Sequence, residues 1–246
     1  MYPEMNGRTV VITGGTSGLG YGISKAFLEQ GAKVIAIYLQ DDEKAKISTE
    51  ELSPLGDFKA VKANITNEEQ IKAVFTSLSA VDYLVNCAGI SHEDEIIKLP
   101  IEKVRAVFET NIIGKIIVSR CAFPLLRKSK YPRIVNIASR FAERPLATAI
   151  PLTATEAGIV MFTKNLALEW AEYGIKVNSV APSLTRTKAV EQYYTPQEFE
   201  TIGNRNPSKR LGKLEDTSNA VLFLCSEKAD YINGENLNVN GGILLV

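Results

Sequence analysis

The segment Thr9-Val-Val-Ile-Thr-Gly-Gly-Thr-Ser-Gly-Leu-Gly20 joins a run of β-branched residues to a glycine-rich turn. Apolar residues at helical spacing follow, from Ile23 to Leu28, and the pattern ends at Gly31. This order predicts a strand, a tight turn and a helix. Glycines at such a turn let the backbone bend sharply and approach a pyrophosphate, which the amides at the positive end of the helix hold. The segment therefore predicts a dinucleotide site, although a glycine turn can also serve the backbone conformation alone.

The same alternation of strand and helix continues along the chain. Further strands are predicted over 33–39, 58–63, 81–85, 133–138, 175–180 and 237–239, and helices over 41–52, 67–78, 101–127 and 153–170. Asn67 is the expected N-cap of its helix, and Asp41 and Asp42 are expected to cap theirs. Apolar strands separated by helices predict a parallel sheet covered on both faces. We therefore predict a single α/β domain over 1–246, a Rossmann-type doubly wound sheet of about seven strands.

The composition excludes several classes of protein. The 246 residues carry 28 Lys and Arg against 28 Asp and Glu, so no basic face for nucleic acid is expected. One histidine and three widely spaced cysteines, Cys87, Cys121 and Cys225, give no metal-ligand pattern. The chain shows neither a leader pattern nor an apolar run long enough for a membrane. We expect a cytoplasmic protein without a metal, nucleic-acid or membrane partner.

Further motifs follow the glycine turn in a fixed order. They are Asn64-Ile65, Asn86-Cys-Ala-Gly89, Asn111, the strand 133–139 that ends in Ser139, the strand 175–182 that ends in Pro182, Thr187, and Asn240-Gly-Gly242. With these motifs the chain resembles the short-chain dehydrogenase/reductase (SDR) family from Thr9 to Gly242. Within that family it is most similar to the 3-oxoacyl-(acyl-carrier-protein) reductases. The resemblance implies hydride transfer between NAD(P)(H) and a carbonyl or alcohol.

The resemblance also implies a set of cofactor contacts. The corresponding positions are Gly14, Thr16, Ser17, Gly18, Leu19, Gly20, Tyr38, Asn64, Ile65, Asn86, Ala88, Gly89, Pro182 and Thr187. Tyr38 stands where an acid would bind the adenine ribose of NAD. Neither Ser17 nor Leu39 offers a cation for a 2′-phosphate, so the sequence indicates no choice between NAD and NADP.

The Tyr and Lys that carry the family's chemistry are absent from their expected positions. Counting from Ser139, the Tyr position is Leu152 and the Lys position is Glu156. Tyr21 and Lys25 have the right spacing but lie in the first helix, where a structural role is expected. Without the ribose-binding Lys, we expect cofactor affinity to fall about ten- to a hundredfold.

Three residues remain as catalytic candidates: Asn111, Ser139 and Glu156. Ser139 ends a strand at the edge where open α/β sheets bind ligands, or it caps the following turn. Asn111 belongs to a site or bonds neighbouring backbone. Four roles are open for Glu156. It accepts hydrogen bonds from the ribose hydroxyl groups, acts as a general acid or base, or forms an ion pair with Arg140 or Arg144. The fourth alternative is that its side chain contacts nothing. If it is buried beside Leu152, its pKa should rise above its usual value, which would let a neutral acid donate a proton.

Two further features concern the substrate and the assembly. Residues 184–207 contain Val190, Tyr193, Tyr194, Phe199 and Ile202, which predict either a lid over an apolar substrate or a surface helix with a buried face. In SDR relatives the helices corresponding to 101–127 and 153–170 form a subunit contact. The resemblance therefore implies a homodimer or homotetramer.

Three classes of function are left open. The first is an atypical NAD(P)H-dependent oxidoreductase acting on a small or carrier-linked carbonyl, in which Ser139, an ordered water or Glu156 replaces the Tyr. The second is a non-catalytic ligand-binding protein or partner subunit. The third is a non-redox isomerase or dehydratase that uses Glu156 as acid or base.

Overall fold

The computed structural model describes residues 2–191 and 194–246, and a parallel sheet runs through them. Its seven strands lie in the order β3-β2-β1-β4-β5-β6-β7. They are β1 (Thr9–Thr13), β2 (Lys33–Tyr38), β3 (Phe58–Lys62), β4 (Tyr83–Asn86), β5 (Arg133–Ile137), β6 (Lys176–Pro182) and β7 (Asn236–Val239). The predicted doubly wound parallel sheet is confirmed. Because all strands are parallel, their carboxyl ends meet at one edge of the sheet.

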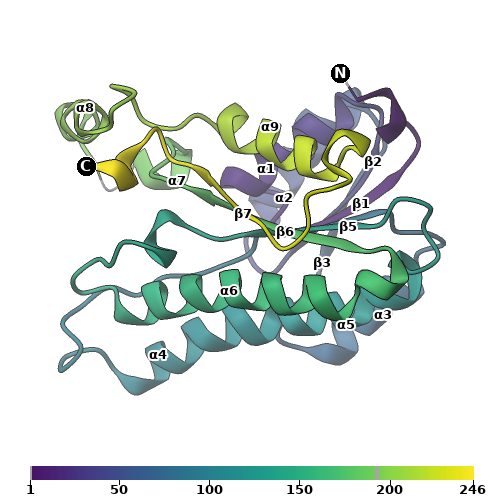
Figure 1. Cartoon of the computed structure of the whole chain (residues 1–246), viewed down its shortest axis with the longest axis horizontal. Helices are drawn as coiled ribbons and strands as arrows, with labels where there is room; N and C mark the ends of the chain where they lie inside the picture. Colours follow the sequence, from purple (N-terminus) through teal and green to yellow (C-terminus); the bar gives the residue numbers. More distant parts are fainter. Residues whose placement is uncertain (1, 192–193) are drawn as a thin grey trace.

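Helices cover both faces of this sheet (Figure 1). They are α1 (Gly18–Leu28), α2 (Asp42–Leu52), α3 (Glu68–Thr76), α4 (Ile101–Phe108), α5 (Lys115–Leu126), α6 (Ile150–Glu169), α7 (Lys188–Glu191), α8 (Pro196–Arg205) and α9 (Leu214–Cys225). Side chains alternate between two apolar cores: Val10 and Ile12 of β1 join the core with α1 and α9. Val11 joins the core with α3, α5 and α6. This alternation explains why the strands are apolar throughout.

The predicted helix over 101–127 is interrupted by a π-helical turn at Glu109–Gly114, between α4 and α5. Asn111 lies in this turn, and its side chain bonds the backbone of Ile90. A periodicity of apolar residues does not reveal such a turn, because it is stabilised by a contact distant in sequence. The predicted Asn67 cap is confirmed, since its side chain accepts a hydrogen bond from Gln70 N.

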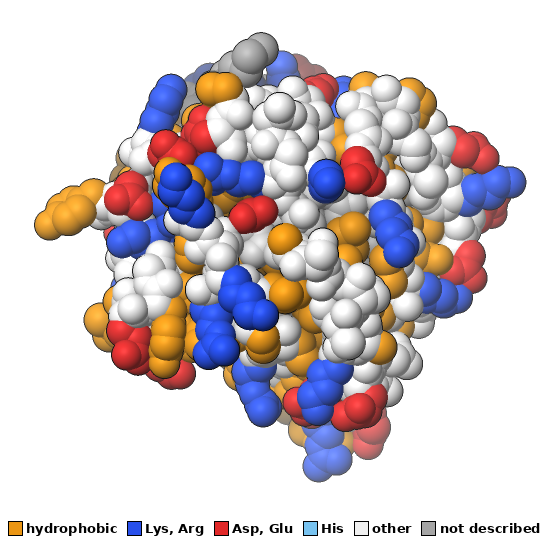
Figure 2. Space-filling model, turned by 90° about the vertical axis from the view of Figure 1, so that its right-hand side faces the viewer, with side chains coloured by type: hydrophobic (Ala, Val, Ile, Leu, Met, Phe, Trp, Pro, Cys, Tyr) orange, Lys and Arg blue, Asp and Glu red, His pale blue; other side chains and the backbone are white. Residues whose placement is uncertain are grey.

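The surface carries both signs of charge. Figure 2 shows one face on which Lys and Arg are interspersed with Asp and Glu. Within residues 2–191 and 194–246, no helix combines the length and apolar character that a membrane span requires.

Candidate functional site

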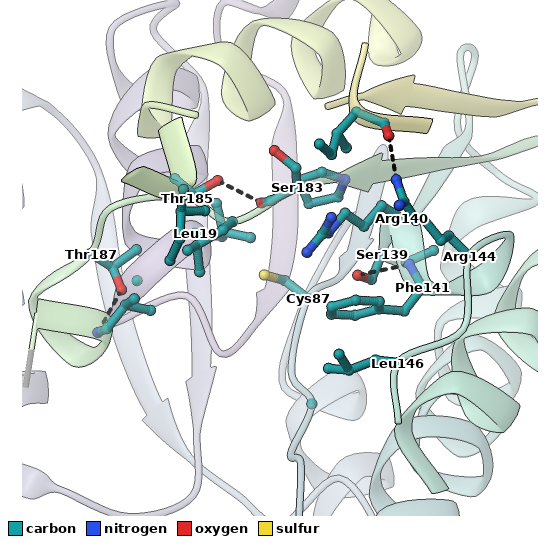
Figure 3. A pocket seen from close by; sticks show the side chains of 18 of the residues that line it. Leu19, Cys87, Ser139, Arg140, Phe141, Arg144, Leu146, Ser183, Thr185 and Thr187 are labelled. Carbon is teal, nitrogen blue, oxygen red and sulfur yellow. Dashed lines mark hydrogen bonds between the residues drawn. The ribbon is translucent and has the colours of Figure 1, made fainter. Parts of the chain in front are cut away.

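A cavity of about 870 Å³ opens at the carboxyl edge of the sheet. Segments that are distant in sequence form its wall: the turn after β1, the segment Cys87–Gly89 after β4, Ser139 after β5 and Pro182 at the end of β6 (Figure 3). The predicted site residues that line it are Gly14, Ser17, Gly18, Leu19, Gly20, Ala88, Gly89, Ser139, Pro182 and Thr187. The fold therefore brings the glycine turn and Ser139 into one cavity.

The other predicted site residues do not line this cavity. They are Thr16, Tyr38, Asn64, Ile65, Asn86, Asn111 and Glu156. Asn86 is buried and donates to Ser119 Oγ and Asn136 Oδ1. Asn64 accepts hydrogen bonds from the backbone N and Oγ1 of Thr66, so it stabilises the turn after β3.

The glycine turn has the shape that a pyrophosphate requires. A Cβ on Gly20 would lie 2.1 Å from the carbonyl oxygen of Gly14, which itself has φ +69°. The first backbone N–H groups of α1 have no hydrogen-bond partner within the helix, and they form the positive end of its dipole. Thr13 Oγ1 accepts hydrogen bonds from Cys87 N (3.0 Å) and Ala88 N (3.1 Å), joining the turn to the next strand end. These residues fit a dinucleotide.

At the carboxyl end of β2, polar and charged side chains bind one another. Tyr38 OH donates to Asp42 Oδ1 (3.1 Å), and Lys62 Nζ donates to Asp42 Oδ2 (2.7 Å). Asp41 accepts from Lys44 N (2.9 Å), which confirms it as the cap of α2, whereas Asp42 is the first residue of the helix, so its predicted capping role is wrong. The contacts at this end favour neither NAD nor NADP.

Ser139 combines two of the roles expected for it. Its Oγ accepts a hydrogen bond from Phe141 N (3.3 Å) and caps the 3₁₀ turn Arg140–Ala142. The same hydroxyl group lies on the cavity wall (Figure 3). Since the cap uses Ser139 only as an acceptor, its O–H proton can still be donated to a ligand.

Asn111 holds the backbone of the next segment. Its Oδ1 accepts from Ile90 N (2.9 Å), and its Nδ2 donates to Ile90 O (3.0 Å) and Thr155 Oγ1 (3.2 Å). The side chain is buried, and both the oxygen and the nitrogen of its amide group are used in these contacts. Asn111 thus fixes the position of the chain directly after Gly89, which lines the cavity.

Glu156 is buried in α6, with 8% of its surface exposed. Its Oε2 has no hydrogen-bond partner among the described residues. Burial raises the pKa of Glu156 to about 7, and the charge of Lys115 opposes this rise. The expected effect of burial on this carboxyl group is confirmed.

An ion pair of Glu156 with Arg140 or Arg144 is not present among the described residues, so this expectation is wrong. Arg144 Nη1 instead donates to Ile243 O (2.8 Å) and to Val246 O. Both arginines follow β5 and line the cavity, which Glu156 does not reach. The helix therefore directs the carboxyl group away from the arginines.

Lys115 is a buried cation that the sequence analysis missed. It begins α5 with 2% of its surface exposed, and its Nζ donates to Asn86 O (3.1 Å) and Ala88 O (2.9 Å). Burial lowers the pKa of Lys115, and Glu156 raises it. The signal in the sequence is a lone Lys within the apolar run 112–118. The chain thus holds a cation on α5 and an acid at the Lys position of α6.

The segment 184–207 contributes to the cavity from α7 and α8. Val190, Tyr194 and Ile202 line the cavity. Phe199 is buried, and its ring lies 5.5 Å from that of Tyr194. Tyr193 lies outside the described residues. The segment therefore combines a cavity wall with a helix that buries one face.

Comparisons with known proteins find relatives along nearly the whole chain. The family model for enoyl-(acyl carrier protein) reductase matches residues 14–244. The 3-oxoacyl-(acyl-carrier-protein) reductase of Vibrio cholerae is 33% identical over 99% of this chain and 100% of its own length. The 3beta-hydroxysteroid dehydrogenase 1 of Eggerthella lenta is 32% identical over 100% of this chain and 97% of its own. A structure from Beutenbergia cavernae with bound NADP at low occupancy has a TM-score of 0.91 and 29% identity, covering 98% of each chain.

Proposed function

This chain belongs to the SDR family of NAD(P)(H)-dependent oxidoreductases, and we propose that it reduces a small or carrier-linked carbonyl without the family's Tyr–Lys pair. The observation that carries the proposal is the single cavity that holds both the glycine turn and Ser139. When bound, the cofactor supplies a hydride. The residues of the chain must therefore position the carbonyl and stabilise its oxygen.

We assign the hydrogen bond to the substrate oxygen to Ser139. It is the catalytic candidate that lines the cavity, whereas Asn111 and Glu156 lie behind the wall. A donor aimed at the oxygen stabilises the charge that develops there. The final proton comes from solvent water and reaches the oxygen either through the Ser139 hydroxyl group, which solvent reprotonates, or through an ordered water. Asn111 acts as a positioning residue for the segment after Gly89.

The cofactor is expected to bind more weakly than in relatives that have the Lys. Lys115 does not replace it, because its Nζ donates to two backbone carbonyls and Lys115 does not line the cavity. We therefore propose that the affinity for the cofactor is about ten- to a hundredfold lower than in relatives that have the Lys. The apolar wall from α7 and α8 supports a substrate with an apolar portion, and the Vibrio cholerae relative acts on a carrier-linked one by its name.

A substrate panel tests the proposal. Small ketones and carrier-linked 3-oxoacyl compounds are followed at the NAD(P)H absorbance band, and mass spectrometry detects non-redox products. Turnover that consumes NADH or NADPH supports the proposal. Isomerised or dehydrated products without a change in nicotinamide oxidation state would instead identify the non-redox class, and cofactor binding without any product would identify a ligand-binding protein.

The Ser139→Ala variant tests the assignment of the hydroxyl group. Loss of one hydrogen bond to the developing charge should lower kcat about 10²- to 10³-fold. Cofactor affinity, measured by calorimetry, should change little. Exposed Ser53→Ala is the matched control and should retain wild-type turnover. Equal activity of wild type and Ser139→Ala would refute the assignment.

A further inference from the structure

The lining of the cavity carries an excess of positive charge. The charged residues that line it are Arg140, Arg144, Arg205 and Glu93. The lining thus contains three guanidinium groups and one carboxylate. Low-dielectric walls strengthen the field from such a set of charges.

Arg140 is the most informative of these residues. It is half-buried, and among the described residues its guanidinium has no hydrogen-bond acceptor and no acidic partner. Figure 3 shows its side chain extending into the cavity near Cys87 and Ser183. Its own neighbour Phe141 provides a ring face 4.6 Å from the guanidinium carbon. Burial and the charge of Arg144 lower the pKa of Arg140, so this environment disfavours its cation.

Several other arginines of the chain have acidic partners. Arg133 pairs with Asp230, Arg186 with Glu191, and Arg210 with Asp216. Withdrawing a cation from water is unfavourable unless an anion compensates for it. Arg144 does not compensate, because it is itself a cation whose Nη1 donates to backbone carbonyls. The guanidinium donors of Arg140 are therefore left for a ligand anion to use.

The position of Arg140 distinguishes a substrate anion from the cofactor pyrophosphate. The pyrophosphate site is the glycine turn with Leu19, which lies across the cavity from Arg140 and Arg144 (Figure 3). Arg140 directly follows Ser139, the proposed donor to the carbonyl oxygen. An anion at Arg140 thus lies in the same cavity as the proposed carbonyl site.

We propose that Arg140, reinforced by the charge of Arg144, binds an anionic group of the substrate, a carboxylate or a phosphate. The planar guanidinium matches both groups through paired hydrogen bonds. Because Ser139 and Arg140 line the same cavity, the carbonyl and the charge belong to one small molecule. The substrate class is a short oxo acid or oxo phosphate. This inference rests on the proposed function, since it names the substrate of the same site.

Matched pairs of substrates test the proposal. The pairs are 3-oxobutanoate with its methyl ester, and dihydroxyacetone phosphate with dihydroxyacetone. Wild type should show a kcat/KM at least about tenfold higher for the charged member of one pair, which also identifies the anion. Arg140→Gln should reduce this preference about ten- to a hundredfold, and Arg140→Lys should retain part of it. Arg120→Gln, which alters an exposed ion-paired arginine of α5 outside the cavity, should retain it in full.

Direct binding separates this inference from the proposed function. NMR titrations with both substrate pairs and with NADH are compared for wild type and Arg140→Gln, after circular dichroism has shown that the variant is folded. Selective binding of charged compounds by wild type only, without turnover, would support the anion site and refute the reductase. Turnover with equal preference for charged and neutral compounds in both proteins would overturn the anion site alone. Weaker NADH binding by the variant with an unchanged substrate preference would also overturn it, by assigning Arg140 to the cofactor.

Discussion

Glu156 and Lys115 place two ionisable groups in the apolar layer between the sheet and the helices α5 and α6. Neither side chain reaches the cavity, yet Lys115 holds the carbonyl groups of Asn86 and Ala88. Ala88 lines the cavity. Lys115 thus connects this buried pair of ionisable groups to the cavity wall.

The pH dependence of stability should report on Glu156. Its pKa is raised from 4.5 to about 7 in the folded chain, so the folded state binds more protons between these values. The contribution of Glu156 to the free energy of unfolding is fully present below pH 4.5 and is lost as the pH rises through about 7. In Glu156→Gln, the difference in unfolding free energy between pH 5 and pH 8 should be smaller by about 1 to 3 kcal/mol than in the wild type. Urea unfolding at a series of pH values measures it. Parallel pH profiles for both proteins would contradict the prediction.

Lys115→Met should destabilise the chain by about 2 to 4 kcal/mol, because two backbone carbonyls lose a donor and Glu156 loses the nearby opposite charge. Adding Glu156→Gln should recover about 0.5 to 3 kcal/mol through the coupling of the two sites. Urea unfolding of the four proteins measures both quantities. Exposed Lys25→Met is the control and should change stability by less than about 0.5 kcal/mol. Strictly additive effects would show that the two groups do not interact.

At the scale of elements, a buried Lys stands on α5, and an acid stands on α6 at the position of the family's Lys. Restoring the family pair by Leu152→Tyr and Glu156→Lys would place a second cation near buried Lys115. We predict that this double variant is destabilised and inactive as a carbonyl reductase. A third change, Lys115→Val, should restore stability and raise carbonyl reduction about 100-fold over the double variant. Thermal melts and NADPH consumption measure the two effects, and a stable, active double variant would contradict the prediction.

The sequence predicted elements better than contacts. The runs from Thr9 to Gly20 and around Asn67 determine a strand, a turn and a cap through neighbouring residues, so they could be predicted locally. The π-helical turn could not, because Asn111 stabilises it through Ile90. Glu156 was identified as unusual from alignment with the family alone. The charge of Lys115 near Glu156 could not be predicted in this way, because it depends on how α5 and α6 pack against each other.

At the scale of the whole molecule, apolar side chains remain exposed on α4 and α6, which pack side by side on one face of the sheet (Figure 1). Met161 and Leu168 are 55% and 79% exposed on α6, and Ile101 and Phe108 are exposed on α4. The spacing of seven residues within each pair places it on one helix face. Exposed apolar surface of this kind favours association.

We predict that the chain forms a homodimer or homotetramer through these helices. Met161→Glu with Leu168→Glu should shift the mass towards the monomer, measured by light scattering after size-exclusion chromatography. Lys25→Glu on α1, on the other face of the sheet, is the control and should leave the mass unchanged. A monomeric wild type at micromolar concentration would contradict the prediction.

The strand order also determines when the fold can form during synthesis. β1 pairs on one side with β2 and on the other with β4, where Val10 meets Tyr83. These partners are about 70 residues apart, and such non-local pairing slows folding. A ribosome that has released only the first three strands therefore exposes a chain whose β1 lacks one neighbour. Until β4 emerges, that open edge is a surface on which nascent chains can associate and chaperones can act.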